Sequence, residues 1–475
     1  MDESAMSSIC KPYFPQPELA GKILRRAAKA FLYALLILST AVFLYFFRST
    51  KTIPAITLIA SGDLPSPTNL SHIIFAIGGS TKTWQRRREY CELWWKPGKM
   101  RGHVWLDVAP TEWPDTCPPW RVSKPAAKQA ARIARIAAEE YGMGVEGVRW
   151  FVMGDDDTIF FPENMAAVLG KYDHEEMYYV GAASESVEQD EKHSYGMAYG
   201  GGGFAVSYPA AAALAGGIDG CLRRYDRLYG SDQRVHACFS EIGVPLTREP
   251  GFHQVDLRGD IYGLLAAHPI APLLSLHHLD YVPPISPLFH SQLQALRSLI
   301  NATRADQPRA LQQSFCYLHE RRLNWSISVS WGYTAQIYPW LLSPKELEVP
   351  IRTFRTWKTS DIRHFTFNTR ELAVPSRPCE RPLRYFLEAV EERREGTVTE
   401  YRRHGWGDEG KERCGKLGFE AMGAVKKVRV TASRMDPMLW RKAPRRQCCG
   451  AKKNDKNIID VHVRDCRPGE ITSPI

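Results

Sequence analysis

Several common signatures are missing from this sequence of 475 residues. No Cys-x-x-Cys pair occurs among its 11 cysteines, which argues against a cysteine zinc site, and no internal repeat is visible. Near the predicted strands there is neither a P-loop nor a Gly-x-Ser-x-Gly pattern, so P-loop nucleotide hydrolysis and serine hydrolase chemistry have no support. What remains is a chain of 44% hydrophobic composition that can bury a large core and form two or three domains.

One long apolar run lies near the N-terminus. Residues 31–47 carry no charge, and they follow Lys22, Arg25, Arg26 and Lys29. These positive charges predict a cytosolic N-terminus and a lumenal remainder, and no small-x-small cleavage site follows the run. A span of about 17 residues is short, which favours a thin membrane of the early secretory pathway. We therefore expect a single-pass type II membrane protein of the Golgi.

The cysteines and glycosylation motifs agree with a lumenal location. Ten cysteines follow the apolar run, an even number, so we expect disulfides whose pairing the sequence does not reveal. Asn69, Asn301 and Asn324 each begin an Asn-x-Ser/Thr triplet and are candidate glycosylation sites. The net charge of +10 suggests anionic glycans or phosphates, or only solubility, in a lumenal protein, and we expect no nucleic-acid partner.

The chain is predicted to divide into five segments. They are a cytosolic tail (1–29), a signal-anchor transmembrane helix (30–47), a stalk (48–70), an α/β domain (71–313) and a smaller β-rich domain (314–475). In the α/β domain, apolar strands at 72–77, 103–108 and 177–182 alternate with helices expected to begin near Ser123 and at Asp232. This alternation predicts a mixed, mostly parallel sheet with helices on both faces. In the last domain, polar and apolar residues alternate at 324–331, as in antiparallel hairpins.

The run from Trp150 to Asp157 is the most informative segment. A buried strand is expected here, and it ends abruptly in Asp155, Asp156 and Asp157. Along an extended chain Asp155 and Asp157 point the same way and Asp156 points the other way. Three adjacent carboxylates repel one another unless a cation neutralises them, and hard divalent cations prefer such oxygen ligands. The alternative is a solvated acidic turn.

An ordered series of motifs accompanies this run. It consists of residues 72–77, the segment 84–88 with Arg86, Arg87 and Arg88, the run 150–157, the glycines at 200–203 followed by Phe204, Ser231-Asp232, and Phe252-His253. In content and order these motifs resemble those of Fringe-type β1,3-glycosyltransferases. The whole chain is most similar to the plant Fringe-related proteins whose C-terminal region is a domain of unknown function. The resemblance implies a GT-A-like nucleotide-sugar-binding fold that transfers a hexose from a UDP-sugar to a hydroxyl of a glycan or other acceptor, with inversion and a β1,3 linkage.

The resemblance also implies a metal site. Asp157 and Asp155 match the family's metal motif, and Asp156 matches a residue that helps to hold the donor. A histidine ligand would favour Mn²⁺, although Mg²⁺ is possible with carboxylates alone. The family pattern Phe-His-Ser-His places its second histidine at Val255 here, so His253 is our candidate ligand. The other candidates are His268, His277 and His278.

Asp232 matches the position of the family's catalytic base, which takes the proton of the acceptor hydroxyl. The family's Pro-Asp-Asp pattern is replaced here by Gly230-Ser231-Asp232. Asp is also a preferred helix N-cap residue, so a capping role is the alternative, and the two roles can coexist.

Further residues are expected at the donor. Gly78 and Gly79 would frame the uridine, and Arg87, or else Arg86 or Arg88, would offset the charge of the diphosphate. Gly201, Gly202 and Gly203 lack Cβ atoms, so their backbone could approach the sugar closely. By the same resemblance, Cys91 and Cys117 fit a disulfide in this half of the domain.

Two other functions are open on this sequence. A lumenal carbohydrate-binding or scaffold protein could keep the fold without turnover, as the departures at Ser231 and Val255 suggest, whereas Asp157 and Asp232 argue for an enzyme. A metal-dependent phosphoesterase could also use clustered aspartates, but it would need a second cluster of acids and histidines, and none is visible. The sequence therefore favours a glycosyltransferase over these two functions.

Overall fold

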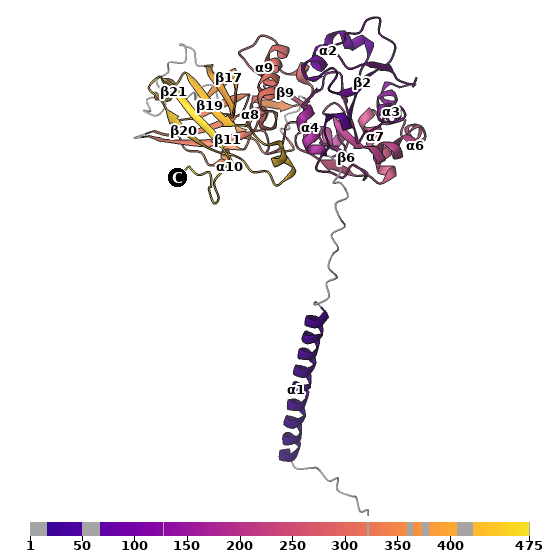
Figure 1. Cartoon of the computed structure of the whole chain (residues 1–475), viewed down its shortest axis with the longest axis vertical. Helices are drawn as coiled ribbons and strands as arrows, with labels where there is room; N and C mark the ends of the chain where they lie inside the picture. Colours follow the sequence, from indigo (N-terminus) through magenta and orange to yellow (C-terminus); the bar gives the residue numbers. More distant parts are fainter. Residues whose placement is uncertain are drawn as a thin grey trace, which may run out of the picture. The chain divides into compact units, whose positions relative to one another are not determined.

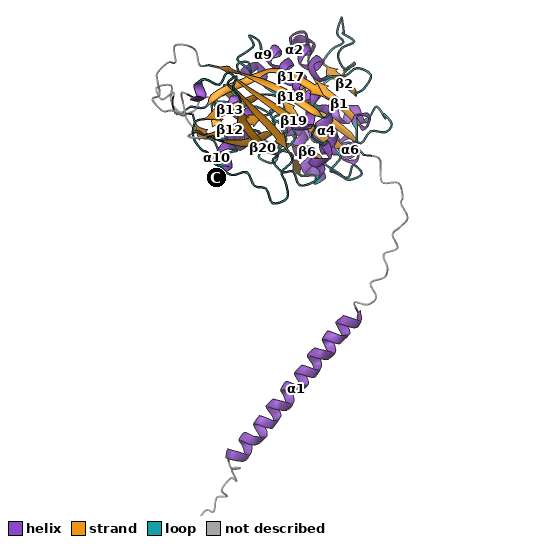
Figure 2. Ribbon diagram, turned by 60° about the vertical axis from the view of Figure 1, so that its left-hand side comes forward, coloured by secondary structure: helices purple, strands orange, loops and turns teal. Residues whose placement is uncertain are grey.

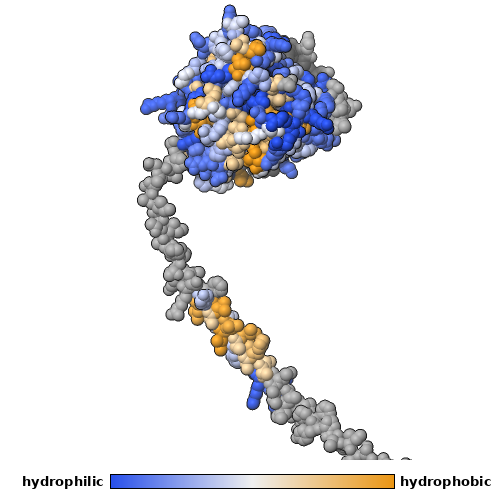
Figure 3. Space-filling model, turned by 90° about the vertical axis from the view of Figure 1, so that its right-hand side faces the viewer, coloured by the Kyte–Doolittle hydropathy of each residue, from blue (hydrophilic) through white to orange (hydrophobic). Residues whose placement is uncertain are grey.

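The computed structural model describes residues 17–49, 67–126, 128–320, 323–358, 364–372, 379, 381–405 and 421–474. The chain divides into two compact units, Met1–Ser66 and Pro67–Ile475. In the first unit, α1 (Pro17–Ser49) contains the apolar stretch Arg25–Tyr45 (Figure 1). The described side chains of this stretch are exposed (Figure 3). A helix of this length and composition can cross a bilayer, consistent with a single membrane anchor.

The first sheet of the second unit is mixed and mostly parallel, as predicted. Its strands, in spatial order, are β3 (Trp120–Val122), β2 (Arg101–Leu106), β1 (Ile73–Gly78), β4 (Trp150–Asp155), β7 (Phe204–Ser207), β6 (Tyr179–Gly181) and β8 (Leu246–Arg248). Strand β7 runs antiparallel to both of its neighbours, and the other pairs are parallel. The central strand β1 is buried along its whole length, which explains its continuous apolar sequence.

Helices cover both faces of this sheet, so the predicted fold class is confirmed. One face packs against α2 (Thr81–Trp94), α4 (Pro162–Leu169) and α9 (Gln292–Ala305), and the other against α3 (Gln129–Tyr141), α6 (Tyr208–Arg224) and α7 (Ser231–Ile242). Alternate residues of β1 enter the two cores: Phe75 joins the first and Ile74 the second. The helix expected from Ser123 begins at Gln129, and the Ser123 hydroxyl accepts a hydrogen bond from Arg132 of this helix (3.3 Å).

The second sheet is mostly antiparallel, as the alternation of residues 324–331 predicted (Figure 2). Its strands, in spatial order, are β11 (Gln313–Glu320), β12 (Leu323–Ser330), β13 (Thr334–Tyr338), β17 (Leu383–Arg393), β18 (Gly396–His404), β19 (Lys427–Ser433), β21 (Ile458–Arg464) and β20 (Cys448–Lys453). Only the pair β19 and β21 is parallel among these described strands.

Shorter elements lie before, within and between the segments that form the two sheets. They are β5 (Ile159–Phe160), α5 (Val187–Lys192), β9 (Leu257–Gly259), α8 (Tyr262–Ala266), β10 (Ser275–Leu276), α10 (Pro344–Leu347), β14 (Ile351–Arg352), β15 (Phe354–Thr356) and β16 (Arg370–Glu371), with 3₁₀ turns at Leu70–His72, Leu279–Tyr281, Gln307–Arg309 and Pro437–Arg441. One hydrophobic core contains Phe75 of the first sheet together with Phe386 of the second. Residues 67–475 therefore form one compact unit, and the domain boundary at 313/314 stays a prediction.

Disulfides occur in both regions, as expected for a lumenal chain. Cys221–Cys238 joins α6 to α7, Cys316–Cys449 joins β11 to β20, and Cys448–Cys466 closes a short loop. The expected bridge between Cys91 and Cys117 is not formed, and both thiols are buried and free. Their sulfurs face different acceptors: that of Cys91 lies 4.0 Å from the Asp156 carbonyl oxygen, and that of Cys117 lies 3.7 Å from the Glu92 carboxylate.

Candidate active site and metal centre

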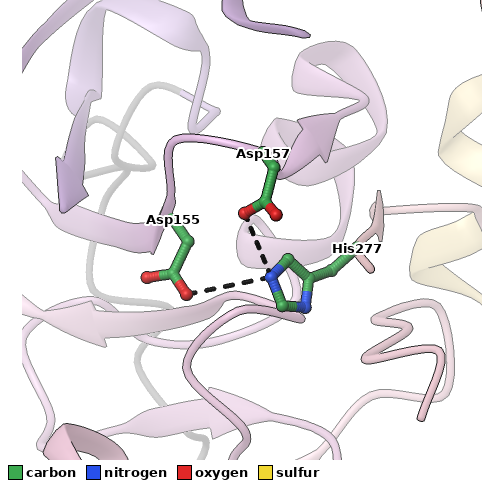
Figure 4. A group of neighbouring side chains, drawn as sticks. All are labelled: Asp155, Asp157 and His277. Atoms are coloured by element: carbon green, nitrogen blue, oxygen red, sulfur yellow. Dashed lines mark ion pairs between the residues drawn. The ribbon is translucent and has the colours of Figure 1, made fainter. Parts of the chain in front are cut away.

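Asp155, Asp157 and His277 come together at the carboxyl end of β4 (Figure 4). Nε2 of His277 lies 3.2 Å from Oδ1 of Asp157 and 3.8 Å from Oδ2 of Asp155. The histidine reaches this position because β10 pairs with β5, which places Leu276 opposite Ile159 and His277 directly beyond it. Asp155 and Asp157 converge as expected while Asp156 makes contacts elsewhere, but β4 ends at Asp155, and a turn at residues 156–157 produces this arrangement rather than an extended chain.

The charges of this group are strongly coupled. Burial opposes ionisation of Asp157, but His277 and Arg87 outweigh it and lower the pKa of this carboxyl to about 2. Burial alone would lower the pKa of His277, yet Asp157, Asp155 and Asp256 raise it to about 9. Burial raises the pKa of Asp155 to about 7; His277 opposes this rise and the neighbouring carboxylates add to it. His277 is therefore protonated at neutral pH and supplies a positive charge between the two acids, and a cation held by its Nε2 would replace that proton.

The residues present fit a divalent cation. The side chain of Asp157 is only 2% exposed, and neither carboxylate oxygen accepts a hydrogen bond of good geometry from the described residues, so only ion pairs satisfy them. The side chain of Asp155 is 40% exposed, which leaves an open side. Two carboxylates and an imidazole are a donor set suited to Mn²⁺.

Arg87 is the basic residue that reaches this site. From α2 its guanidinium contacts Oδ1 of Asp156 at 2.8 Å and Oδ2 of Asp157 at 2.9 Å. Asp156 also accepts a hydrogen bond from the Thr83 hydroxyl (2.9 Å). Asp156, expected at the donor, thus anchors Arg87 beside the group formed by Asp155, Asp157 and His277, which is called the metal group below. Of the two neighbouring arginines on this helix, Arg86 is exposed.

The glycines at 201–203 pack closely against neighbouring residues, a role that the sequence analysis did not predict. A Cβ atom on Gly201 would lie 2.1 Å from Cε1 of His277, so this glycine makes room for the imidazole ring. Gly202 lies against the backbone of Gln254, and Gly203 has a φ of +86°, a value that favours glycine. The structure thus gives this run a role in packing around His277, in addition to the expected approach to the sugar.

The first glycine pair also lines the site region. A Cβ on Gly79 would lie 3.3 Å from Oδ2 of Asp156, whereas one on Gly78 would meet Ile133 of α3 at 3.1 Å. Gly78 belongs to a small cavity that Asp155 and Asp232 also line. The predicted donor glycine Gly78 and the predicted base therefore face the same space.

Asp232 lies in the first turn of α7, close to the metal group. Its Oδ2 accepts a hydrogen bond from the Gly200 amide (3.3 Å), and its Oδ1 accepts one from the Gln233 amide (2.9 Å). The helix N-cap is Gly230, so Asp232 is not the capping residue. Burial raises the pKa of Asp232, which makes its carboxylate a stronger base than an exposed one.

His253 is not part of this group, so the structure corrects our choice of histidine. Its Nδ1 contacts Glu185 at 3.1 Å, and its Nε2 lies 3.0 Å from Nε2 of His268. Both histidines line a separate cavity of about 810 Å³. Val255, at the family's second histidine position, has a φ of 55° and is fully buried, and His277 supplies the imidazole from 22 residues beyond it.

Sequence reasoning also missed Asp280, which lies 3.9 Å from Nε of Arg87 and accepts a hydrogen bond from the Tyr90 hydroxyl. The sequence did offer a signal, since two histidines and an acid follow the short apolar segment 271–276. Away from the site, Asn69, Asn301 and Asn324 are all exposed, as glycosylation would require.

Two family descriptions match the chain. "Protein of unknown function, DUF604" matches residues 189–449, and "Fringe-like" matches residues 68–258. Among curated proteins, the Beta-1,3-glucosyltransferase of Mus musculus is 31% identical over 114 residues, which are 22% of this chain and 21% of the mouse protein. The Beta-1,3-glucosyltransferase of Homo sapiens is 30% identical over 112 residues, 22% of this chain and 20% of the human protein.

This chain thus spans about a fifth of the length of the curated relatives it matches. Among solved structures, a glycosyltransferase involved in the glycosylation of the major capsid of PBCV-1 is similar with a TM-score of 0.24 and 14% identity. That alignment covers 37% of this chain and 82% of the viral one.

The Fringe-like match covers the first sheet and the aspartates at the end of β4. The other match covers more than half of the chain and includes both His277 and most of the second sheet. These matches confirm the resemblance found in the motifs. The chain belongs to the DUF604 family, and its N-terminal half carries a region of the Fringe-like glycosyltransferase type.

Proposed function

We propose that this protein is a metal-dependent glycosyltransferase that moves a hexose from a UDP-sugar to a hydroxyl of a glycan or other acceptor, with inversion. The observation that carries the proposal is the convergence of Asp155, Asp157 and His277 beside Asp232. When bound, a divalent cation supplies Lewis-acid stabilisation of the charge that develops on a departing diphosphate. Mn²⁺ is the preferred ion because one ligand is an imidazole, and Mg²⁺ is the alternative.

The chain's own residues account for the remaining steps. Asp155, Asp157 and His277 would hold the cation, and Arg87 would exchange part of its contact with Asp157 for the diphosphate of the donor. The acceptor oxygen then bonds to the anomeric carbon as the bond from that carbon to the diphosphate oxygen breaks. The hydroxyl proton passes to the carboxylate of Asp232, whose raised pKa suits it to this role.

The linkage and the location are proposed on separate grounds. A β1,3 linkage is proposed from the Fringe resemblance and from the printed names of the mouse and human relatives. A Golgi membrane location with the catalytic region in the lumen is proposed from α1, the basic residues that precede its apolar run, the disulfides and the exposed Asn-x-Ser/Thr sites.

The test is UDP release from a panel of UDP-sugars by the purified full-length chain in detergent, with Mn²⁺, Mg²⁺ or chelator. We expect Mn²⁺-dependent release with one preferred donor, stimulated by a glycan acceptor. If UDP binds with Mn²⁺ but no donor turns over, the chain is a carbohydrate-binding or scaffold protein on the same fold. Absence of UDP binding would overturn the proposed function altogether.

A further inference from the structure

The C-terminal region reaches the metal group through one aromatic residue. Trp357 lies between Arg258 and His278: the guanidinium carbon of Arg258 is 3.9 Å from the centre of the indole, and the His278 ring stacks on it at 4.6 Å and 17°. His278 in turn contacts the ring of His277, with ring centres 3.9 Å apart. A continuous series of ring contacts, stacked at Trp357 and tilted by 34° between the two histidines, therefore runs from Trp357 to the imidazole beside Asp155 and Asp157.

Backbone pairing fixes the position of Trp357. The strand β15, which directly precedes this residue, pairs antiparallel with β9, so that Thr356 lies opposite Leu257. On the other side of Trp357, the amide of Lys358 donates a hydrogen bond to Glu188 (2.5 Å). The indole is thus held from both sides by contacts between the C-terminal region and the Fringe-like region.

His278 needs such support because its backbone is strained. Its φ is 53°, in the left-handed region that residues other than glycine rarely adopt. Asp256 holds the His278 ring, with Oδ1 3.0 Å from Nδ1, and accepts a hydrogen bond from the Ser184 hydroxyl at 2.7 Å. Strain of this kind persists only where surrounding contacts enforce it.

We propose that Trp357, with Arg258 and Asp256, forms a clamp that orients His278 and thereby sets the position of His277 in the metal site. On this view the C-terminal region completes the metal site, and Trp357 is a positioning residue that does not touch the cation. The inference rests on the proposed function, because it concerns the same cation. The C-terminal region thereby supports one side of the transferase site.

The test measures Mn²⁺ affinity directly, without turnover. Full-length chain in detergent is titrated with Mn²⁺ in the presence of UDP, and free Mn²⁺ is followed by its EPR signal. Outer residues that orient a metal ligand are worth about 10- to 100-fold in metal affinity, so Trp357→Ala should weaken Mn²⁺ binding by about 10-fold or more. Trp357→Phe retains an aromatic face and should recover most of the loss.

Trp340→Ala is the matched control. Trp340 is another half-buried tryptophan of the C-terminal region, but it packs against Tyr338 in a separate cluster with Phe315. Its replacement should lower thermal stability without changing Mn²⁺ affinity. The clamp is refuted if Trp357→Ala binds Mn²⁺ as the wild type does, or if Trp340→Ala weakens binding equally. If the wild-type chain binds no Mn²⁺, the proposed function itself fails.

Should Trp357→Ala not fold, Arg258→Ala provides a second route. This change removes the cation from one face of the indole and leaves the β9–β15 pairing in place. A loss of Mn²⁺ affinity of about threefold, near the 0.5–1 kcal/mol expected of a cation–π contact, supports the clamp. Wild-type affinity in a folded Arg258→Ala chain that unfolds at the same temperature counts against it.

Discussion

The two sheets of residues 67–475 place their polar side chains in different ways. In the first sheet, β1, β2 and β4 are parallel, so the residues that follow them emerge at one edge, where Asp155 and Asp157 meet the glycines at 200–203. In the second sheet, most neighbours are antiparallel, and their ends alternate between the two edges. The three candidate metal ligands all come from the first region. Parallel strands thus bring the candidate functional residues together at one edge of the first sheet, whereas the second sheet contributes none of the three candidate ligands.

The largest expected effect comes from Asp157. Changing Asp157→Asn keeps the shape of a side chain that is 2% exposed but removes the charge that faces His277 and Arg87. We expect Mn²⁺ affinity to fall by at least about 100-fold and transfer to fall with it. Calorimetric titration with Mn²⁺ and a UDP-release assay measure the two effects.

Asp173→Asn is the control for Asp157→Asn, because Asp173 is an acid of the same region whose carboxylate accepts a hydrogen bond from the exposed Glu175 amide. It should change neither affinity nor turnover. Near-normal metal affinity in a folded Asp157→Asn chain would contradict the claim that the first region holds the metal ligands.

Next in size is Asp232. Changing Asp232→Asn should lower transfer by about 10²- to 10⁴-fold, the usual contribution of a general base, and leave Mn²⁺ and UDP binding intact. In the wild type, burial raises the pKa of Asp232, and the base works only when it is deprotonated. The turnover rate should therefore fall as pH drops through a pKa above that of an ordinary aspartate.

The pH profile of kcat provides the measurement for Asp232. The acidic limb assigned to this carboxyl should be absent from the residual activity of Asp232→Asn. If that limb persists unchanged, or if the variant turns over normally, another group is the base.

A change in the second sheet should lower stability and leave Mn²⁺ affinity unchanged. Replacing both Cys316 and Cys449 by Ala removes the disulfide that joins β11 to β20 across a sequence separation of 133 residues. Loop-closure entropy predicts a loss of about 4–5 kcal/mol in the free energy of unfolding. Urea unfolding measures this loss, while Mn²⁺ affinity below the transition should match the wild type. A parallel loss of affinity would show that the site depends on the whole second sheet.

The smallest expected effects come from replacing two glycines by alanine. Gly201→Ala places a Cβ 2.1 Å from the His277 ring, so the ring must move, and we expect Mn²⁺ affinity to fall by about 10-fold, or 1.4 kcal/mol. Gly216→Ala, in α6, meets no atom within 4 Å and should instead stabilise the chain by about 0.5–1 kcal/mol. Mn²⁺ titration and thermal unfolding of both variants distinguish crowding at the site from a general effect of alanine.

Local patterns in the sequence predicted much of this fold. The unbroken apolar segments ending at Gly78 and Asp155 are buried central strands, and the alternation at 324–331 is an antiparallel strand. Asp156 is separated from Asp155 and Asp157 as expected, although the cause is a turn at residues 156–157 and not alternation along an extended chain. These features depend on neighbouring residues alone, and such information is present in any single sequence.

Features that depend on distant pairing could not be predicted. His277 rather than His253 joins the aspartates because β10 pairs with β5. The sequence of neither segment predicts this pairing. Cys91 and Cys117 face different acceptors because of how α2 and the loop after β2 pack. Likewise, the stack of Trp357 on His278 follows from the register of β15 on β9.

The central claim is that Asp155, Asp157 and His277 bind a divalent cation, and pulsed EPR of bound Mn²⁺ tests it most directly. A coordinated imidazole nitrogen modulates the Mn²⁺ echo, so the wild type with UDP should show nitrogen coupling. Our account predicts that His277→Gln abolishes this coupling and that His253→Gln retains it. Coupling that survives His277→Gln and disappears in His253→Gln would contradict the metal site described here.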